Sequence, residues 1–562
     1  FHEVQAKMVN KKSIEKHVLA NAILHKGKAH PGAIVGKILA EDPNAKSKMK
    51  EIMPHIHKTV QEVNKIAPEK QKSLLKRIWP KFFHKEKQVK GLSELPGAVM
   101  GKVVTRFPPE PGKYMTVGHA LSFLINYIYA QKYDGKCVLR FEDTNAEKAN
   151  QEAVDSFLDS TKQFLDIKPS KVVYISDDIL KLYKELEKLL NKKQAYVCSC
   201  PADKMSKLRR KKISCPHRTQ TVKQNLELWK KMLAGKEGLA VRLMGKMESN
   251  NATLRDPVIA RTNKINHYRY KDKFCVWPTY DFANTCEDEW CGITHILRGI
   301  EFGNERIELQ KYIAKLLGFR EKFYVQYGRI NVSGLEKSSG RVLRALVTKG
   351  AGWDDPRMPT IVALERRGFV KETFYEMAKQ VGLSKTATKI DEKTLAATNR
   401  KFIDTIAPRF FFVANPIKIH IDNMPRIKVA KLQIHPDKYP TRDIKVSKSL
   451  FIEKRDLINN LGREIRLKGL FNVQIPTKPG VIHKKVLCSG AAPKYNLQVI
   501  HWVPKDHVKV DVLLTNGKIV HGMAESNVKD LKIGTIVQFE RFGFCRFDKK
   551  EGDKYIFVFS HL

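Results

Sequence analysis

The sequence lacks long apolar runs and is poor in acidic residues. No uninterrupted apolar stretch approaches the roughly 20 residues that cross a bilayer, so no membrane partner is expected. Asp and Glu number 59 against 103 Lys and Arg, which gives a net charge of +44. Such an excess indicates a nucleic-acid partner bound through its phosphates. The alternative is a lysine-rich surface adapted to heat, but that adaptation normally raises Glu together with Lys.

Cysteine is scarce as well. The nine cysteines are an odd number scattered over 562 residues, which argues against a disulfide scaffold and predicts a reducing, cytoplasmic location. Hydrophobic residues make up 42% of the chain, enough to bury proper cores, and the length requires several domains.

Four regions with different patterns follow one another along the chain. Residues 1–95 read as a basic helical appendage, because apolar residues recur there at helical spacing. Residues 96–345 alternate strands and helices, 346–414 are helical, and 415–562 hold short alternating runs typical of one or two small β-barrels. The predicted fold class is therefore multidomain, α/β plus all-β.

The region 96–345 begins with a strand, a Pro/Gly loop, a helix and a second strand. This order predicts a βαβ unit of a Rossmann-type parallel sheet. A Cys-containing insert is expected at about 191–266, after which the sheet is predicted to resume with KFCVWPTYDFAN (273–284) and ITHILRGIEF (293–302).

The loop TVGH at Thr116–His119 is placed to hold phosphate. A loop between a strand and a helix N-terminus presents backbone N–H groups and a positive dipole. Gly118 lets the backbone approach closely, and His119 can donate to a phosphoryl oxygen as charge builds up. About 220 residues later, LEKSSGR (Leu335–Arg341) leads into GWDDPRMP (Gly352–Pro359).

Cys198, Cys200, Cys215 and His217 form the pattern C-x-C-x14-C-x-H. Three thiolates and an imidazole would make a tetrahedral structural zinc site, which could hold together a short, Lys-rich insert. The alternative is a set of reduced, partly buried cysteines beside an exposed histidine.

Together these motifs resemble the class I aminoacyl-tRNA synthetases for glutamate and glutamine. FPPEPGKYMTVGHA resembles their HIGH region, with Thr116 in place of the first His. LRFEDTN, TYDFAN, GITHILRGIEF and GWDDPRMP follow in the family's order, and VQFERFGFCRF resembles its anticodon barrels. LEKSSGR stands where the KMSKS loop is expected, whereas the literal KMSK at Lys204–Lys207 lies too early and is predicted to be a solvated helix.

The resemblance implies a glutamyl enzyme that uses ATP and Mg²⁺ to activate L-glutamate and transfers it to tRNA(Glu). Whether tRNA(Gln) is also charged is left open, and a monomer is favoured. The implied catalytic residues are Gly118, His119, Lys337 and Arg341. The ATP-binding set is Thr116, Gly118, His119, Lys337, Ser338 and Ser339, and the amino-acid set is Arg106, Glu142, Tyr280 and Arg298.

Two alternatives remain open at this point. The glutaminyl enzymes share nearly all these motifs, but they have a small uncharged residue where Arg298 falls, and the glutamyl enzymes have an arginine. A non-catalytic tRNA-binding paralogue is the other alternative, because TVGH and LEKSSGR both depart from the family pattern.

Overall fold

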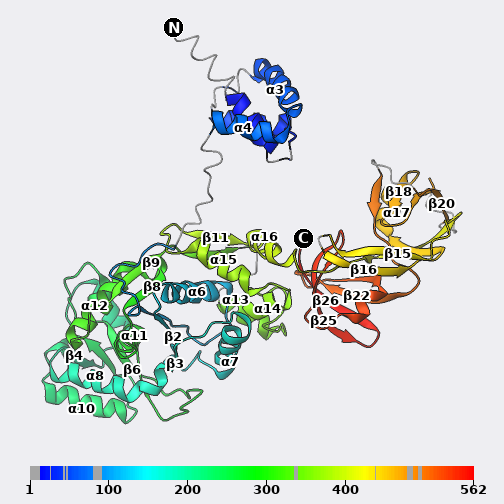
Figure 1. Cartoon of the computed structure of the whole chain (residues 1–562). Coiled ribbons are helices and arrows are strands. Elements are labelled where there is room, and N and C mark those ends of the chain that lie inside the picture. Colours follow the sequence, from blue (N-terminus) through cyan, green and yellow to red (C-terminus); the bar gives the residue numbers. More distant parts are fainter. Residues whose placement is uncertain are drawn as a thin grey trace, which may run out of the picture. The chain divides into compact units, whose positions relative to one another are not determined.

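A computed structural model describes residues 13–23, 25, 27–41, 45, 49–79, 92–333, 340–436, 438–477, 485–491 and 497–562 (Figure 1). The chain forms two compact units, Phe1–Gly91 and Leu92–Leu562. Across the described residues, no helix has the length and apolarity needed to cross a membrane.

The N-terminal unit is helical, as predicted. A helix over 13–23 is followed by three more, α2 (Pro31–Glu41), α3 (Met49–Asn64) and α4 (Pro68–Ile78). They enclose a core of their own that buries Val18, Ile34, Ile56 and Leu75. Gln71 is fully buried and donates to three backbone carbonyls, those of Gly27, Val63 and Ile66. This buried amide therefore ties the turn at Gly27 to the C-terminal end of α3 and the residues that follow it.

The second unit begins with the predicted βαβ unit. Strands β1 (Val104–Phe107), β2 (Lys136–Phe141) and β3 (Lys171–Tyr174) are parallel neighbours in that spatial order. Between β1 and β2 runs α6 (Val117–Lys132), whose buried residues lie on most of its faces. A helix apolar all round must be covered on several sides, and α6 packs against both the sheet and α15 (Lys371–Val381).

The parallel sheet continues on the other side of β1. Strands β8 (His295–Gly299) and β9 (Phe323–Tyr327) pair in parallel, and Thr294 N donates to Val104 O at 3.0 Å just before β8 starts. The spatial order is thus β3, β2, β1, β8, β9, and the direction of strand progression reverses at β1. Helices α11 (Tyr280–Trp290) and α12 (Gly303–Leu317) flank β8 in the sequence, and α7 (Gln151–Asp159) follows β2.

The insert is larger than the sequence suggested. It contains an antiparallel sheet of four strands and three helices. Helix α8 (Ile179–Asn191) precedes the sheet, and α9 (Ala202–Arg210) and α10 (Val222–Leu233) lie between its first two strands in the sequence. The strands are β4 (Ala195–Cys198), β5 (Ala240–Leu243), β6 (Val258–Thr262) and β7 (Val276–Pro278). The prediction that the parallel sheet resumes at Lys273 is wrong, because β7 pairs with β6 and Tyr280 already begins α11. A short buried run reads the same in either kind of sheet, so periodicity could not assign it.

The region after β10 (Ile330–Ser333) is mostly helical, as predicted. It contains α13 (Gly340–Thr348), α14 (Ile361–Arg366), α15 and α16 (Glu392–Ile403). Three short strands were missed in it. Strands β12 (Arg409–Phe410) and β13 (Phe412–Ala414) belong to a sheet of the C-terminal part, and β11 (Thr388–Asp391) pairs in parallel with β10. Only Ile390 of its four residues is fully buried, so its sequence carries no strand signal.

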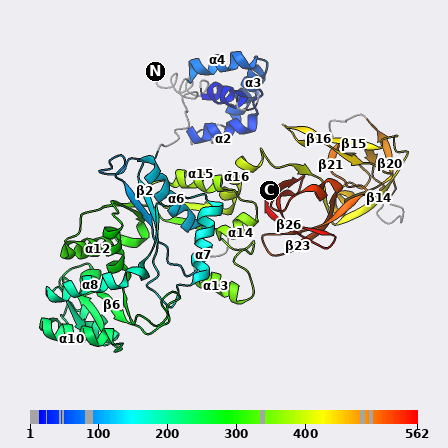
Figure 2. The same cartoon turned by 60° about the horizontal axis from the view of Figure 1, so that its bottom comes forward.

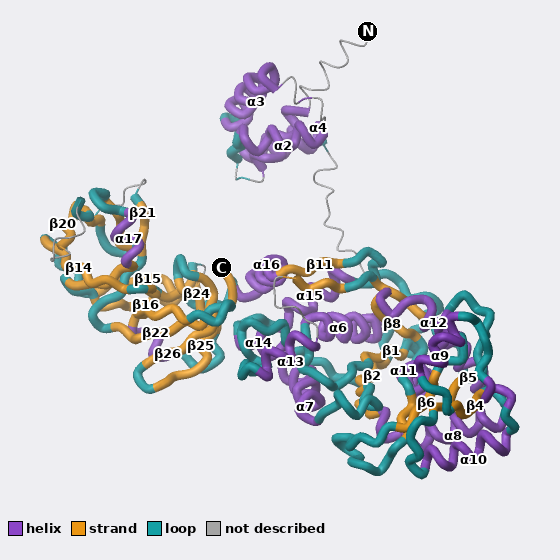
Figure 3. Tube along the Cα trace, turned by 180° about the vertical axis from the view of Figure 1, so that it is seen from behind, coloured by secondary structure: helices purple, strands orange, loops and turns teal. Residues whose placement is uncertain are grey.

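The C-terminal part consists of curled sheets, drawn mainly as strands in Figure 3 and seen end-on in Figure 2. The seven-stranded sheet has the order β12 (Arg409–Phe410), β24 (Ile536–Phe539), β25 (Gly543–Glu551), β26 (Lys554–His561), β22 (His507–Leu513), β23 (Ile519–Glu525), β13 (Phe412–Ala414). The six-stranded sheet has the order β17 (Ser449–Glu453), β14 (Pro416–Asp422), β20 (Lys485–Gly490), β19 (Asn472–Gln474), β18 (Glu464–Leu467), β21 (Gln498–Ile500). Strands β15 (Val429–His435) and β16 (Lys438–Lys445) form a hairpin, and α17 (Lys454–Asn459) follows β17.

Two arginines tie the helical region to the seven-stranded sheet. Arg366 at the end of α14 forms an ion pair with Asp548 at 2.7 Å, and the neighbouring Arg367 donates to Ser560 O at 2.8 Å. Arg367 is completely buried, so this connection is part of the packed interior.

Candidate active site

The carboxyl ends of β1, β2 and β8 open into a cavity of about 790 Å³. Open α/β sheets bind their ligands at the point where the strand order reverses, and β1 is that point here. The predicted site residues that line this cavity are Arg106, Thr116, Gly118, His119, Glu142, Tyr280 and Arg298. Five separate segments of the chain therefore meet at one cavity.

The predicted cationic loop lies largely outside the described residues. Lys337, Ser338 and Ser339 lie outside the described residues. Arg341 falls in the first turn of α13, and its side chain lies outside them too.

The TVGH loop is hydrogen-bonded to the end of GWDDPRMP (352–359) and to the residues that follow it. Val117 N donates to Pro359 O at 3.1 Å, and Ile361 N donates to Met115 O at 2.8 Å. Tyr114 also stacks on Trp353, with ring centroids 5.0 Å apart. Two motifs that lie far apart in the sequence are thus paired backbone to backbone at the mouth of the cavity.

His119 is the third residue of α6 and stays neutral. Thr116 N donates to its Nδ1 at 3.3 Å. Burial lowers the pKa of His119 to about 3, with a further contribution from the charge of Lys113. Because Nδ1 accepts, the proton of the neutral ring is on Nε2. His119 is therefore a neutral hydrogen-bond donor beside the helix N-terminus.

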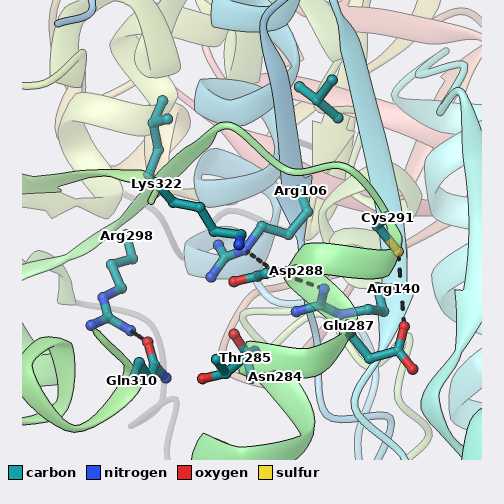
Figure 4. Close-up of polar contacts among 12 residues, drawn as sticks. Arg106, Arg140, Asn284, Thr285, Glu287, Asp288, Cys291, Arg298, Gln310 and Lys322 are labelled. Carbon is teal, nitrogen blue, oxygen red and sulfur yellow. Dashed lines mark hydrogen bonds and ion pairs between the residues drawn. The ribbon is translucent and has the colours of Figure 1, made fainter. Parts of the chain in front are cut away.

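A network of buried charges connects Arg106, one of the residues predicted to bind the amino acid, with Asp288 and Arg140 (Figure 4). Asp288 Oδ1 accepts from Arg106 Nε at 3.2 Å and from Arg140 Nη1 at 2.8 Å, and all three side chains are at most 2% exposed. Burial alone would raise the pKa of Asp288, but the two guanidinium groups outweigh it and lower that pKa. Asp288 therefore stays ionised and fixes Arg106 through its Nε.

Glu142 is the second carboxylate of the network. Its Oε1 accepts from Arg140 Nη2 at 3.2 Å and from Asn284 Nδ2 at 2.9 Å. Burial nevertheless raises the pKa of Glu142 to about 7. The group is thus poised to ionise when a cation enters the cavity.

Three residues of this network were not predicted from the sequence: Arg140, Asn284 and Asp288. Arg140 lies in LRFEDTN, two residues before Glu142, and Asn284 and Asp288 lie one turn apart on α11. The (i, i+4) spacing of the last two places them on one face of the helix. That spacing, following Tyr280, is the signal that could have found them.

Arg298 lies at the end of β8 and is 4% exposed. Its Nη1 donates to Gln310 Oε1 at 3.1 Å, while its Nε and Nη2 are buried without a partner among the described residues. The rings of Phe302 and Tyr324 lie 5.6 and 5.4 Å from the guanidinium carbon. Burial, helped by the nearby charge of Arg106, lowers the pKa of Arg298.

Comparison with known proteins identifies the family. Models of "tRNA synthetases class I (E and Q)" match the catalytic domain over residues 102–405 and the anticodon-binding domain over 407–488 and 499–548. The glutamate–tRNA ligase of Pyrococcus furiosus is 41% identical over 97% of this chain and 98% of its own. That of Methanocaldococcus jannaschii is 37% identical over the same shares.

The chain belongs to the glutamate–tRNA ligase family of class I tRNA synthetases. A solved glutamate tRNA ligase from Elizabethkingia meningosepticum, in complex with its amino acid, is 16% identical and covers 54% of this chain and 70% of its own. Its TM-score is 0.40.

The synthetase's insert carries the Cys/His cluster. The metal-binding atoms of Cys198, Cys200, Cys215 and His217 all lie within 4.8 Å of one another. The sulfur of Cys215 lies 3.6 and 3.8 Å from the other two sulfurs, and His217 Nδ1 lies 3.4 and 3.5 Å from two of the three. With Zn–S bonds of about 2.3 Å, a tetrahedron has S–S edges of about 3.8 Å. The donor set therefore fits a zinc ion.

The literal KMSK lies on α9, inside this insert, and all its residues except Met205 are exposed. The sequence expectation of a solvated helix is confirmed. The cavity lining does not include any of the four.

Proposed function

We propose that this synthetase joins L-glutamate to tRNA(Glu) in two steps. An oxygen of the glutamate α-carboxylate attacks the α-phosphate of ATP, a P–O bond forms, and pyrophosphate leaves. The terminal ribose hydroxyl of the tRNA then attacks the activated carbonyl, and AMP leaves. No protein nucleophile is needed, so the chain contributes positioning and charge stabilisation.

The environment of Arg298 is the observation that favours glutamate over glutamine as the substrate. It lines the cavity with two buried N–H groups that have no partner among the described residues. An unmatched buried donor costs about 1–3 kcal/mol, and the side-chain carboxylate of glutamate would satisfy both through charge-assisted bonds. Glutamine would offer one oxygen and set its NH₂ against a second donor. The site therefore favours the acid over the amide.

Three other side chains would hold the rest of the amino acid. Arg106, fixed by Asp288, provides a second guanidinium of fixed orientation. Glu142 provides a carboxylate for the α-ammonium group, and Tyr280 reaches the substrate side chain. Burial raises the pKa of Tyr280 to about 12, so its hydroxyl remains a donor.

The ATP phosphates would lie along the N-terminus of α6. The loop with Thr116 and Gly118 supplies backbone N–H groups, and His119 supplies a neutral Nε2–H. Lys337 and Arg341, with Ser338 and Ser339, would close over the triphosphate as a cationic loop. The phosphates would carry Mg²⁺, which would supply positive charge to offset theirs.

The remaining parts would handle the tRNA. We assign residues 415–562 to anticodon reading, 346–414 to the inside of the tRNA bend, 96–345 to catalysis, and 1–95 to a basic appendage without an assigned role. We propose a monomer, and we propose the cytoplasm as its location because the nine cysteines form no disulfide. The Cys/His cluster would hold a structural Zn²⁺ in the insert, with Ser199 Oγ 3.1 Å from His217 Nε2 as the outer partner.

The experiment is aminoacylation by the wild-type enzyme with glutamate and glutamine in parallel, each with tRNA(Glu) and tRNA(Gln). We expect glutamylation of tRNA(Glu), and the tRNA(Gln) reaction shows whether the enzyme is selective for one tRNA. Preferential use of glutamine would make this a glutaminyl enzyme. Tight tRNA binding without ATP–pyrophosphate exchange, with tRNA present, would make it a non-catalytic paralogue.

A further inference from the structure

Arg298 differs from its neighbours in how its charge is matched. Arg106 and Arg140 share the carboxylate of Asp288, and Arg140 also contacts Glu142. Arg298 makes no ion pair within the described residues, and the one side chain that accepts from it is the amide of Gln310. Gln310 is 1% exposed and lies on α12.

The orientation of this amide is set by its other contact. Gln310 Nε2 lies 3.1 Å from Asp281 Oδ1. An ionised carboxylate only accepts and a guanidinium only donates, so the NH₂ must face Asp281 and the oxygen must face Arg298. Arg306 completes the chain, with Nη1 at 3.3 Å from Asp281 Oδ2. The four residues form a hydrogen-bonded chain whose two end residues, Arg306 and Arg298, both line the cavity.

We infer that Gln310 is a specificity-determining residue, which positions Arg298 without neutralising it. The inference rests on the proposed role of Arg298. A carboxylate at position 310 would also accept from the guanidinium, but it would face Asp281 as a second acceptor, and it would satisfy the positive charge before the substrate arrives. The amide leaves that charge for the γ-carboxylate of glutamate. Gln310 thus belongs to the machinery that separates glutamate from glutamine, although the cavity lining does not include it.

The test compares the selectivity ratio, kcat/KM for glutamate over kcat/KM for glutamine, in Gln310→Glu and wild-type enzyme, with tRNA present. At pH 8.5 we expect the ratio to fall about 10²-fold, because the introduced carboxylate becomes the partner of Arg298. At pH 6 we expect most of the ratio to return, because burial and the facing carboxylate of Asp281 should raise the pKa of the introduced group against the opposing effect of Arg298. Once protonated, the introduced carboxyl group donates to Asp281 and accepts from Arg298 as the amide does. Titration of Glu142 cancels in the ratio, because both substrates carry the same α-ammonium group.

Gln224→Glu is the matched control. Gln224 is exposed, and its Oε1 only accepts, from Thr221 N at 2.8 Å and from Thr221 Oγ1 at 3.1 Å, so a carboxylate replaces it without loss. Its ratio should stay within about twofold of wild type at both pH values.

Gln310→Met is a second route that adds no buried charge. Met has a similar volume but no oxygen to accept from Arg298, so the guanidinium loses its positioning partner, and the ratio should fall about tenfold, with KM for glutamate rising and KM for ATP unchanged. This variant decides the matter if Gln310→Glu does not fold.

Arg298→Ala, measured alongside, separates the two claims. If it keeps the wild-type ratio, the proposed role of Arg298 is wrong. If Arg298→Ala loses the ratio, two results for Gln310→Glu overturn only the inference about Gln310. In one, Gln310→Glu keeps the wild-type ratio; in the other, it lowers kcat/KM for glutamate and for glutamine equally.

Discussion

At the scale of single residues, the site is built from charges whose partners are unequal. Asp288 serves two arginines, Glu142 serves one arginine and one amide, and Arg298 has an amide alone. Buried ion pairs add little net stability, so their value here is geometric. They fix Arg106 and leave Arg298 to be completed by substrate.

Glutamate use should depend on pH through Glu142. Burial raises its pKa to about 7, and only the ionised form holds an ammonium group. The value of kcat/KM for glutamate should therefore rise through pH 7 and level off above it, since kcat/KM reports the free enzyme. His119, with a pKa of about 3, does not titrate in this window.

The control for this pH profile is Glu287→Gln. Burial raises the pKa of Glu287 to about 8, but Glu287 is not among the residues that line the cavity. The rise should persist in that variant and disappear in Glu142→Gln. A flat wild-type profile between pH 5.5 and 8.5 would show that Glu142 is ionised before substrate binds.

At the scale of elements, sequence reasoning located the strands and loops that carry chemistry better than it located their neighbours. The apolar run at residues 101–107 predicted β1, and the turn residues before and within TVGH predicted the start of α6. β7 was assigned to the wrong sheet and β11 was missed, since pairing partners far along the chain decide both. Asp288 and Gln310 could not be predicted as site residues for the same reason. A lone Asp or Gln on a helix is usually exposed to solvent, and it is the tertiary fold that buries these two.

The cationic loop can be tested against its decoy. Replacing Lys337 and Arg341 together with Ala should lower kcat about 10²-fold or more with little change in tRNA affinity, because the loop acts on the phosphates in the transition state. The exposed pair Lys204 and Lys207 on α9 is the control, and its double Ala variant should keep wild-type kcat. The reverse ranking would mean that α9 holds the catalytic loop.

The Cys/His cluster should carry zinc. Purified protein that has never met a chelator should contain about one equivalent by elemental analysis, and Cys200→Ser together with Cys215→Ser should abolish it. Acid should release the ion, because the ligands must be deprotonated. Metal-free protein with an intact, equally stable insert would leave the four residues as reduced side chains.

At the scale of the whole molecule, the net charge of +44 should make the tRNA-binding constant K depend strongly on salt concentration. Log K should fall linearly with log salt, with a slope of about −0.7 to −0.9 for each phosphate contact. A tRNA footprint of several contacts therefore gives a steep line in a filter-binding or fluorescence titration. A nearly flat line would favour the heat-adapted surface.

The most direct test of the account is the Arg298→Ala enzyme, assayed for tRNA(Glu) charging with glutamate and with glutamine. Arg320→Ala, which removes a surface arginine paired with Glu289, is the matched control. We predict that Arg298→Ala lowers kcat/KM for glutamate about 10²-fold or more and leaves that for glutamine nearly unchanged, since only the carboxylate loses its partner. Near wild-type glutamate charging by Arg298→Ala would contradict the claim that this buried guanidinium selects the substrate.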